Sequence, residues 1–173
     1  MDSVSVSRTL ARISHEIIEK NSEDTDKLCI VGIRRRGVSI AKTLSENIKR
    51  FYGIDLPVGE LDITLYRDDL LAEDNQPVVS DTKLDFPIRD KIVILADDVL
   101  FTGRTARAAM EAVLAMGRPS KIQLAVLIDR GHREFPIRGD YVGKNVPTSK
   151  KERISVRVPE FDGEDAVLLL CEN

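Results

Sequence analysis

The N-terminal part of the chain alternates between apolar spacing typical of an amphipathic helix and a run typical of a buried strand. Residues 5–20 have an apolar residue at every third or fourth position, which predicts a helix with one apolar face. Those positions are Val6, Leu10, Ile13 and Ile17. The apolar run 27–33 predicts a strand, and a second helix is expected after the polar loop 34–37. That helix should end near Gly53 and carry Ala41, Leu44, Ile48 and Phe51 on one face.

The period of the pattern changes at residue 58. Apolar and polar residues alternate over 58–66, which predicts a half-buried strand. The segment 68–90 has no periodicity and is interpreted as a flexible active-site flap, because so long a loop in a compact domain is usually functional. Further strands are predicted at 91–96, 122–128, 140–142, 153–158 and 166–170. The helix between the first two should bury Ala109, Val113 and Met116 and end at Gly117.

Strands that alternate with helices predict an α/β domain in which a central, mainly parallel sheet is flanked by helices. Residues 1–173 are expected to form this single domain, because the length suits one domain and no repeat or linker interrupts it. Three polar loops, 34–37, 97–105 and 129–138, each follow a predicted strand. Ligands of open α/β sheets bind at the carboxyl ends of the strands, so we expect these loops to form one site.

Composition narrows the classes of function. The 26 basic and 29 acidic side chains give a net charge of -3, which argues against binding nucleic acid through overall positive charge but leaves a local basic face open. No apolar stretch approaches the roughly 20 residues needed to cross a bilayer, so no membrane partner is expected. Cys29 and Cys171 lie in apolar runs and are predicted to be buried, which suits a cytoplasmic protein.

The residues that most clearly suggest a ligand site follow the strand predicted at 91–96. Asp97 and Asp98 should emerge at its end, where adjacent carboxylates repel each other unless hydroxyl donors or a cation relieve them. A ribose diol, or Mg²⁺ bound to a diphosphate, would do so. Residues 102–105 then combine two hydroxyls, a glycine and a helix start, which together favour a phosphate. The alternative is a helix cap formed by Asp97 or Thr102.

The segment VILADDVLFTGRT, residues 93–105, resembles the phosphoribosyl diphosphate (PRPP) signature of type I phosphoribosyltransferases. The resemblance implies the fold of that family, with a small hood and a flexible loop, and a catalytic role for Asp97 and Asp98 in holding the ribose hydroxyls. The implied PRPP site consists of Arg35, Arg36, Gly37, Asp97, Asp98, Val99, Leu100, Phe101, Thr102, Gly103, Arg104 and Thr105. A solvated basic turn is the alternative interpretation of residues 34–37.

Phe101 departs from the signature in an informative way. Hypoxanthine–guanine members of the family carry an aspartate at this place, against the purine ring. An aromatic residue offers no general base, which disfavours a purine substrate. The alternative is that Phe101 simply packs over the loop.

Three longer segments resemble the family of bifunctional pyrimidine-operon attenuation regulators and uracil phosphoribosyltransferases, the PyrR family. They are GELDITLYRDDL at 59–70, GRPSKIQLAVLIDRGHREFPIR at 117–138 and DYVGKNVPTS at 140–149. The resemblance implies that uracil and PRPP, with Mg²⁺ bound to the PRPP, give UMP and pyrophosphate. The implied base-binding residues are Asp129, Arg130, Tyr141 and Val142, with the Tyr141 ring stacked on uracil and the Val142 backbone at its edge. A core position is the alternative for Tyr141.

Two basic groups resemble the positions at which that family binds an mRNA stem-loop of the pyr leader. The implied RNA-binding residues are Arg8, Arg12, His15, His132, Arg133, Arg138 and Lys144. Lysine and arginine contacts to phosphate dominate RNA affinity, and arginine can also stack on unpaired bases. A homodimer or higher homo-oligomer is expected. The alternatives are a solvated helix face for the first group and a place in the substrate pocket for His132 and Arg133. A phosphoribosyltransferase without an RNA-binding role, or one acting on another base, is the alternative function.

Overall fold

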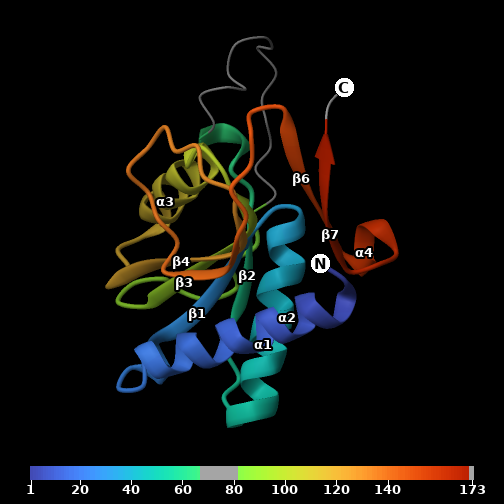
Figure 1. Cartoon of the computed structure of the whole chain (residues 1–173). Coiled ribbons are helices and arrows are strands. Elements are labelled where there is room, and N and C mark those ends of the chain that lie inside the picture. Colours follow the sequence, from blue (N-terminus) through green and yellow to red (C-terminus); the bar gives the residue numbers. More distant parts are fainter. Residues whose placement is uncertain (67–81, 172–173) are drawn as a thin grey trace.

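The computed structural model describes residues 1–66 and 82–171. Its centre is a five-stranded sheet in the order β2-β1-β3-β4-β5, and every pair of neighbouring strands is parallel (Figure 1). The strands are β1 (Leu28–Ile33), β2 (Val58–Leu61), β3 (Ile92–Leu100), β4 (Lys121–Asp129) and β5 (Tyr141–Asn145). The predicted α/β class is confirmed. The strand order reverses between β1 and β3, which makes this the topological switch point where ligands of such sheets bind.

Helices cover both faces of the sheet. The helices α1 (Ser3–Lys20) and α2 (Arg36–Tyr52) pack on one face, and α3 (Arg104–Met116) packs on the other (Figure 1). Successive residues of β3 serve the two faces in turn: Ile94 belongs to the core beneath α1 and α2, and Leu95 to the core beneath α3. The sheet is therefore packed between two apolar layers, and polar side chains lie at the ends of its strands. Among the described residues, no helix combines the length and the apolar character that crossing a membrane requires.

Local signals set the helix ends. Asp2 caps α1, because its Oδ1 accepts a hydrogen bond from the Ser5 amide at 2.9 Å. The predicted end of α2 at Gly53 is confirmed, and the φ of 70° at this residue is a conformation that glycine adopts without strain. The prediction that Met116 points inward is wrong: this residue is 42% exposed, because it lies in the last turn of α3. Phe51, on the predicted apolar face of α2, is likewise 39% exposed in the last turn of that helix.

Two strands differ in length from the sequence prediction. β2 ends at Leu61, because Asp62 turns the chain: its Oδ1 accepts from the Thr64 amide at 3.0 Å and from the Thr64 hydroxyl at 2.6 Å. The single 3₁₀ turn η2 (Thr64–Tyr66) follows instead of a continued strand. β3, in contrast, continues past its predicted end at residue 96 to Leu100. The flap predicted over 68–90 lies outside the described residues as far as residue 81.

A small hood stands apart from the central sheet. It is an antiparallel hairpin of β6 (Glu152–Arg157) and β7 (Ala166–Cys171), with the short helix α4 (Pro159–Asp162) between the strands (Figure 1). α4 lies against the start of α2, where Asp162 pairs with Arg36 and Glu160 accepts from the Ser39 hydroxyl. The Cys171 thiol at the end of β7 is exposed, so the prediction that both thiols are buried holds for Cys29 alone.

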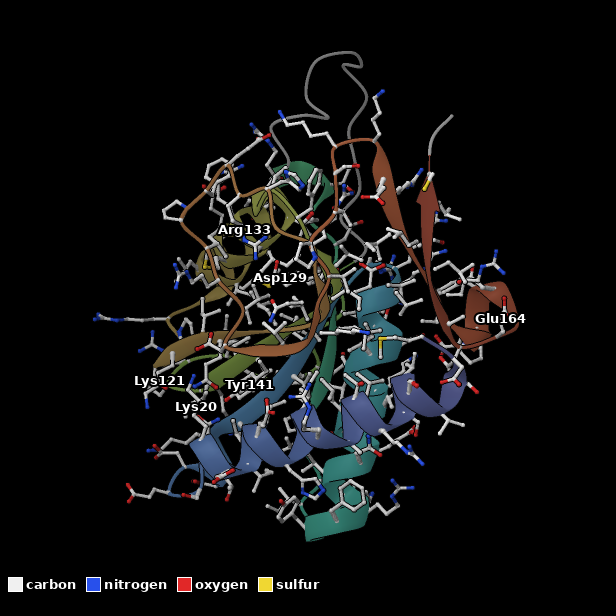
Figure 2. The ribbon with its side chains drawn as sticks, viewed as in Figure 1. Lys20, Lys121, Asp129, Arg133, Tyr141 and Glu164 are labelled. Carbon is white, nitrogen blue, oxygen red and sulfur yellow. The ribbon has the colours of Figure 1, made fainter. Side chains whose placement is uncertain are left out.

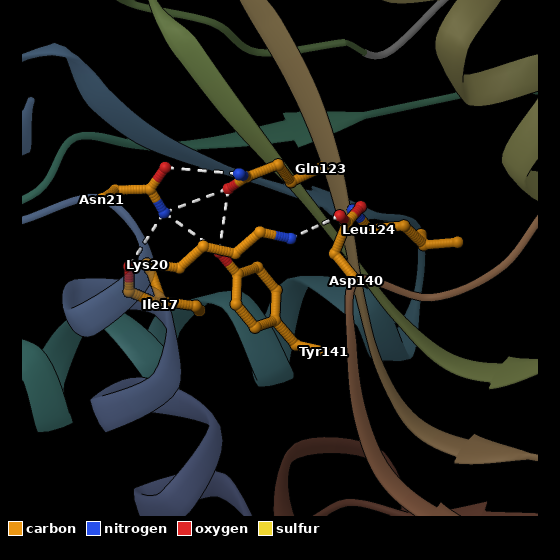
Figure 3. A network of polar contacts seen from close by, with 7 residues as sticks. All are labelled: Ile17, Lys20, Asn21, Gln123, Leu124, Asp140 and Tyr141. Atoms are coloured by element: carbon orange, nitrogen blue, oxygen red, sulfur yellow. Dashed lines mark hydrogen bonds and ion pairs between the residues drawn. The ribbon is translucent and has the colours of Figure 1, made fainter.

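A buried polar network joins α1 to the two last strands of the sheet (Figure 3). The Tyr141 hydroxyl donates to Gln123 Oε1 at 2.9 Å and accepts from Asn21 Nδ2 at 2.9 Å. The side chains of Asn21 and Gln123 also bond each other, with 3.2 Å between Gln123 Nε2 and Asn21 Oδ1. Burial raises the pKa of Tyr141 to about 12, so the hydroxyl keeps its proton in the folded protein. Each member of the network therefore depends on the others to satisfy its polar atoms.

The substitution Tyr141→Phe is expected to lower the free energy of unfolding by about 1–3 kcal/mol, because it removes two buried hydrogen bonds, one from Asn21 Nδ2 and one to Gln123 Oε1. Urea unfolding followed by circular dichroism would measure the change. The matched control is Tyr52→Phe, which removes a hydroxyl from a ring that is 43% exposed and should change stability by less than about 0.5 kcal/mol. Equal effects of the two substitutions would contradict the structural role of the network.

Candidate active site

The loops that follow β1 and β3 border a cleft of about 750 Å³ at the switch point. Three kinds of side chain line it: the arginines of 34–36, the carboxylates Asp97 and Asp98 of β3, and polar groups of segment 60–64. Glu160 and Phe161 of α4 close one side. The cleft therefore brings together two of the three loops that the sequence predicts to share a site.

A close approach of two backbones places the arginine loop. A Cβ atom on Gly37 would lie 2.4 Å from the Ala96 carbonyl oxygen, so only glycine lets the first turn of α2 lie this close to β3. The Arg34 amide donates to the Leu61 carbonyl at 3.0 Å, and its guanidinium pairs with Glu60 at 3.2 Å. The peptide bond between Arg34 and Arg35 is cis. The loop is thus fixed at both ends, against β2 and against β3.

The two aspartates belong to β3 itself rather than to a loop after it. Asp97 is 9% exposed, and its Oδ1 accepts from the Asp98 amide at 3.0 Å. Asp98 Oδ1 accepts from the Val99 amide at 2.8 Å. Burial raises the pKa of the Asp98 carboxyl, and the Val99 amide and the positive charge of Arg36 oppose this rise only in part. Such a pair is suited to a ligand that brings hydroxyl donors or a cation.

A second hollow of about 260 Å³ lies at the start of α3 and is lined by Asp97 and residues 99–106. Gly103 takes a φ of 93° at the residue before α3, which lets the loop turn into the helix. The Thr102 hydroxyl oxygen accepts from the Arg104 amide at 3.3 Å, and Thr105 borders both this hollow and the main cleft. The first amides of a helix have no partner within the helix, so the hollow is a ready site for an anion.

The third loop wraps around the outside of the second. Arg130 is buried, its guanidinium carbon lies 4.0 Å from the centroid of the Phe101 ring, and its Nε donates to Thr148 Oγ1 at 3.0 Å. Asp129 accepts from the Gly131 amide at 2.9 Å and pairs with Arg133, and Figure 2 shows these two side chains together. Asp129 and Arg130 therefore hold the loops in place by contacts within the protein.

Comparisons with known proteins agree with this geometry. A family model described as a phosphoribosyl transferase domain matches residues 4–160. The bifunctional protein PyrR of Caldicellulosiruptor bescii is 59% identical over 169 residues, which are 98% of this chain and 92% of the relative. The bifunctional protein PyrR of Clostridium novyi is 59% identical over 167 residues, 96% of this chain and 93% of the relative.

The chain belongs to the PyrR family. Solved structures of more distant proteins show the same fold. The hypoxanthine phosphoribosyltransferase of Trypanosoma cruzi superposes with a TM-score of 0.74 at 14% identity, covering 100% of this chain and 95% of the other. The hypoxanthine phosphoribosyltransferase of Staphylococcus aureus gives 0.61 at 23% identity, covering 83% and 76%. The type I phosphoribosyltransferase fold predicted from residues 93–105 is confirmed.

One base-binding assignment is wrong for this PyrR-family chain. The Tyr141 ring is 2% exposed and faces α1, with its hydroxyl bound to Asn21 and Gln123, so it cannot stack on a ligand in the cleft (Figure 2). The core position left open by the sequence is the one observed. The Val142 carbonyl accepts from Arg12 Nη2 at 3.2 Å, and Val142 does not line the cleft.

The residues predicted to bind RNA fall into two places. Arg12 on α1 donates to the carbonyls of Val142 and Gly143, which brings it beside the exposed Lys144 of β5. Arg8 and His15 are also exposed on α1, and the His15 ring stacks on Phe51 at 4.6 Å. The second place is the third loop, with His132 and Arg133 near the phosphate hollow and Arg138 exposed.

No sequence pattern pointed to the acidic residues of α4. Glu160 and Asp162 face the start of α2: Asp162 Oδ1 accepts from Arg36 Nη2 at 3.0 Å, and Glu160 lies 4.0 Å from the Lys42 ammonium. These contacts join residues more than 100 positions apart in the chain, so no local pattern could have shown them.

The substitution Asp98→Asn is expected to raise the thermal unfolding midpoint at neutral pH. The folded-state pKa of Asp98 lies above that of the unfolded chain, so ionisation of the folded protein costs free energy that a neutral amide avoids. The asparagine oxygen can still accept from Val99. The gain over the wild type should be absent below about pH 4 and should grow as the pH rises through the folded-state pKa.

Differential scanning calorimetry across this pH range would measure the effect. Asp85→Asn is the matched control, because Asp85 is exposed and should give no such pH-dependent gain. A variant of Asp98 that is less stable than the wild type at neutral pH would contradict burial as the dominant influence on this carboxyl.

Proposed function

We propose that this PyrR-family chain transfers the phosphoribosyl group of PRPP to uracil, giving UMP and pyrophosphate, and that UMP promotes its binding to a stem-loop of the pyr mRNA leader. The observation that carries the enzymatic part is the convergence of paired carboxylates, an anion hollow and an arginine loop on one cleft. These groups match the three parts of PRPP: its ribose hydroxyls, its 5′-phosphate and its diphosphate.

The proposed roles follow from position. Asp97 and Asp98 accept hydrogen bonds from the ribose hydroxyls, which relieves the repulsion between the buried Asp97 carboxylate and the half-buried Asp98 carboxylate. Residues 101–105 bind the 5′-phosphate in the hollow at the start of α3. Arg35 and Arg36 line the cleft together with the carboxylates and bind the diphosphate, and the Gly37 amide follows them at the start of α2. Phosphoribosyl diphosphate would thus span the switch point from α3 to α2.

In the reaction, the bond from the ribose C1′ to the diphosphate oxygen breaks and the bond from C1′ to uracil N1 forms, while the N1 proton passes to water and pyrophosphate leaves with the bonding electron pair. The ribose ring carries positive charge in the transition state, and the negative charge of the neighbouring carboxylates stabilises it. The arginines stabilise the departing pyrophosphate. Most of the catalytic effect would come from holding the two reactants in line, since the protein forms no covalent bond to either.

The donor set fits Mg²⁺ that arrives with PRPP. Among the described residues, no three histidine, cysteine or acidic side chains converge as a metal site, so the diphosphate oxygens would supply most of the ligands, with Asp97 and Asp98 nearby. When bound, Mg²⁺ neutralises charge on the leaving pyrophosphate.

We propose that the base binds near Phe101 rather than at Tyr141. Phe101 is 37% exposed, with Arg130 over one face of its ring. An aromatic ring that is fixed on one side and open on the other can contact a flat base, and it offers no carboxylate to a purine nitrogen. This arrangement supports the pyrimidine assignment.

The RNA-binding surface is proposed to include the exposed face of α1 and the neighbouring end of β5. Arg8, Arg12, His15 and Lys144 supply positive charge and a stacked aromatic pair there, and His132 and Arg138 supply the second group. The net charge of -3 makes such a surface local. A cytoplasmic homodimer or larger homo-oligomer would present two copies of each group to one RNA.

A panel of bases offered with PRPP and Mg²⁺ tests the enzymatic proposal. Uracil should be converted and hypoxanthine and orotate should not, as followed by pyrophosphate release. Asp98→Asn and Thr102→Ala are expected to lower kcat/KM by at least about 100-fold, because each removes a contact to PRPP in the transition state. Conversion of hypoxanthine in place of uracil would refute the pyrimidine assignment, and full activity of both variants would refute the site.

A gel-shift assay with a pyr leader stem-loop tests the RNA proposal. UMP should strengthen binding by the wild type, and binding should weaken steeply as salt is raised. Lys144→Ala is expected to weaken binding and to reduce the salt slope by about one, because one phosphate contact is lost. Lys121→Ala, which removes an exposed lysine from the start of β4, is the charge-matched control. No binding even at low salt with UMP present would leave the chain as an enzyme alone.

A further inference from the structure

Three successive carbonyls of the phosphate loop face the same segment of the third loop. The Leu100 carbonyl accepts from the Arg130 amide at 3.0 Å. The Phe101 carbonyl accepts from Arg133 Nη1 at 2.7 Å. The Thr102 carbonyl accepts from the amides of Glu134 and Phe135, at 2.9 and 3.1 Å. Residues 130–135 thus donate hydrogen bonds to the three carbonyl oxygens of residues 100–102.

The orientation of these carbonyls determines where the loop amides point. In a planar trans peptide, the carbonyl of one residue and the N–H of the next point in opposite directions. The only cis bond among the described residues joins Arg34 and Arg35, so the peptides of 100–103 are trans. The amides of Phe101, Thr102 and Gly103 therefore point away from segment 130–135. The anion hollow lies on that side, because it is lined by Asp97 and residues 99–106 and by no residue of the third loop.

Arg133 has a particular part in this arrangement. The Thr102 carbonyl accepts from backbone amides, and the Leu100 carbonyl accepts from the Arg130 amide and, at 3.4 Å, from Arg133 Nη1. For the Phe101 carbonyl the donor is the Arg133 side chain. The same guanidinium donates to the Ile137 carbonyl at 2.9 Å and the Gly131 carbonyl at 3.2 Å, and it pairs with Asp129. Its side chain is 22% exposed. The guanidinium of Arg133 therefore makes its contacts between the phosphate loop and the third loop, although the sequence suggested that it contacts RNA.

The charge of Arg133 adds to its geometric effect. A cation at the Phe101 carbonyl polarises that peptide and makes the N–H of Thr102 a stronger donor. The Asp129 carboxylate balances the charge on the protein side. The Thr102 amide would then point toward a phosphate in the hollow and donate a stronger hydrogen bond to it.

We propose that Arg133 is a positioning residue for the 5′-phosphate site: it holds the Phe101–Thr102 peptide so that the Thr102 amide points at the phosphate of PRPP or UMP. This inference rests on the proposed function, since it assigns a phosphate to the hollow. In this role, Arg133 affects the binding of the nucleotide and does not itself contact RNA.

The test compares ligands that differ only by the phosphate. Affinities for UMP and uridine would be measured by titration calorimetry on the wild type, Arg133→Gln and Arg133→Lys. In Arg133→Gln, the affinity for UMP should fall by about tenfold or more, as expected for a misaligned hydrogen bond to a charged group, while that for uridine stays the same. Arg133→Lys keeps one donor and the charge opposite Asp129, so it should fold and recover part of the loss. Kinetics should agree, with a raised KM for PRPP and an unchanged KM for uracil.

Arg118→Gln is the matched control, because Arg118 is exposed after the end of α3, and it should bind both ligands like the wild type. Equal losses of UMP and uridine affinity in both Arg133 variants would show a general structural role and overturn the inference. So would unchanged UMP affinity combined with weaker RNA binding in the absence of nucleotide, which would mark Arg133 as an RNA contact. Failure of the wild type itself to bind UMP would instead refute the proposed function.

Discussion

At Gly37 the first turn of α2 lies so close to β3 that a Cβ atom would fall 2.4 Å from the Ala96 carbonyl oxygen. This approach brings the arginine loop beside the carboxylates that follow Ala96 on β3. The strand order reverses between β1 and β3, so the two loops leave neighbouring strands at the point where ligands of such sheets bind. Because Gly37 has no side chain, α2 can approach β3 closely at this point. Every proposed contact to PRPP depends on these two loops meeting at this point.

The buried polar groups of the molecule fall into two classes with different consequences. Asn21, Gln123 and Tyr141 satisfy one another completely and stabilise the fold. Asp98 is half-buried and only partly compensated, and its desolvation is expressed as a raised pKa. A site that binds hydroxyl groups must keep acceptors available before the ligand arrives, so part of the folding free energy is given up at β3.

The sequence predicts the parts of the structure that depend on local patterns. Helix and strand periodicity located the sheet and its flanking helices, and the segment 93–105 located the phosphate loop. Prediction failed where a contact between distant residues decides the outcome. Tyr141 is an aromatic residue that could stack on a base, yet its partners at the end of α1 and on β4 hold it in the core. No local pattern marked Asp162, which pairs with Arg36, a residue far from it in the sequence.

Arg133 shows the same limit for function. Its place in a basic segment is typical of an RNA contact, and only the direction of its side chain reveals the bond to the Phe101 carbonyl. Charge patterns in sequence count cations but do not show which of them are already engaged by backbone carbonyls.

The contacts of Arg130 have a consequence for how the molecule can move. This one guanidinium lies over the Phe101 ring and donates to Thr148 Oγ1 and to the carbonyls of Ser149 and Glu152, at the entrance to β6. Arg130 thereby links the base of the hood to the phosphate loop, while α4 is held against α2 by Asp162 and Glu160. A displacement of the Phe101 ring would therefore reach the start of β6 through this single side chain.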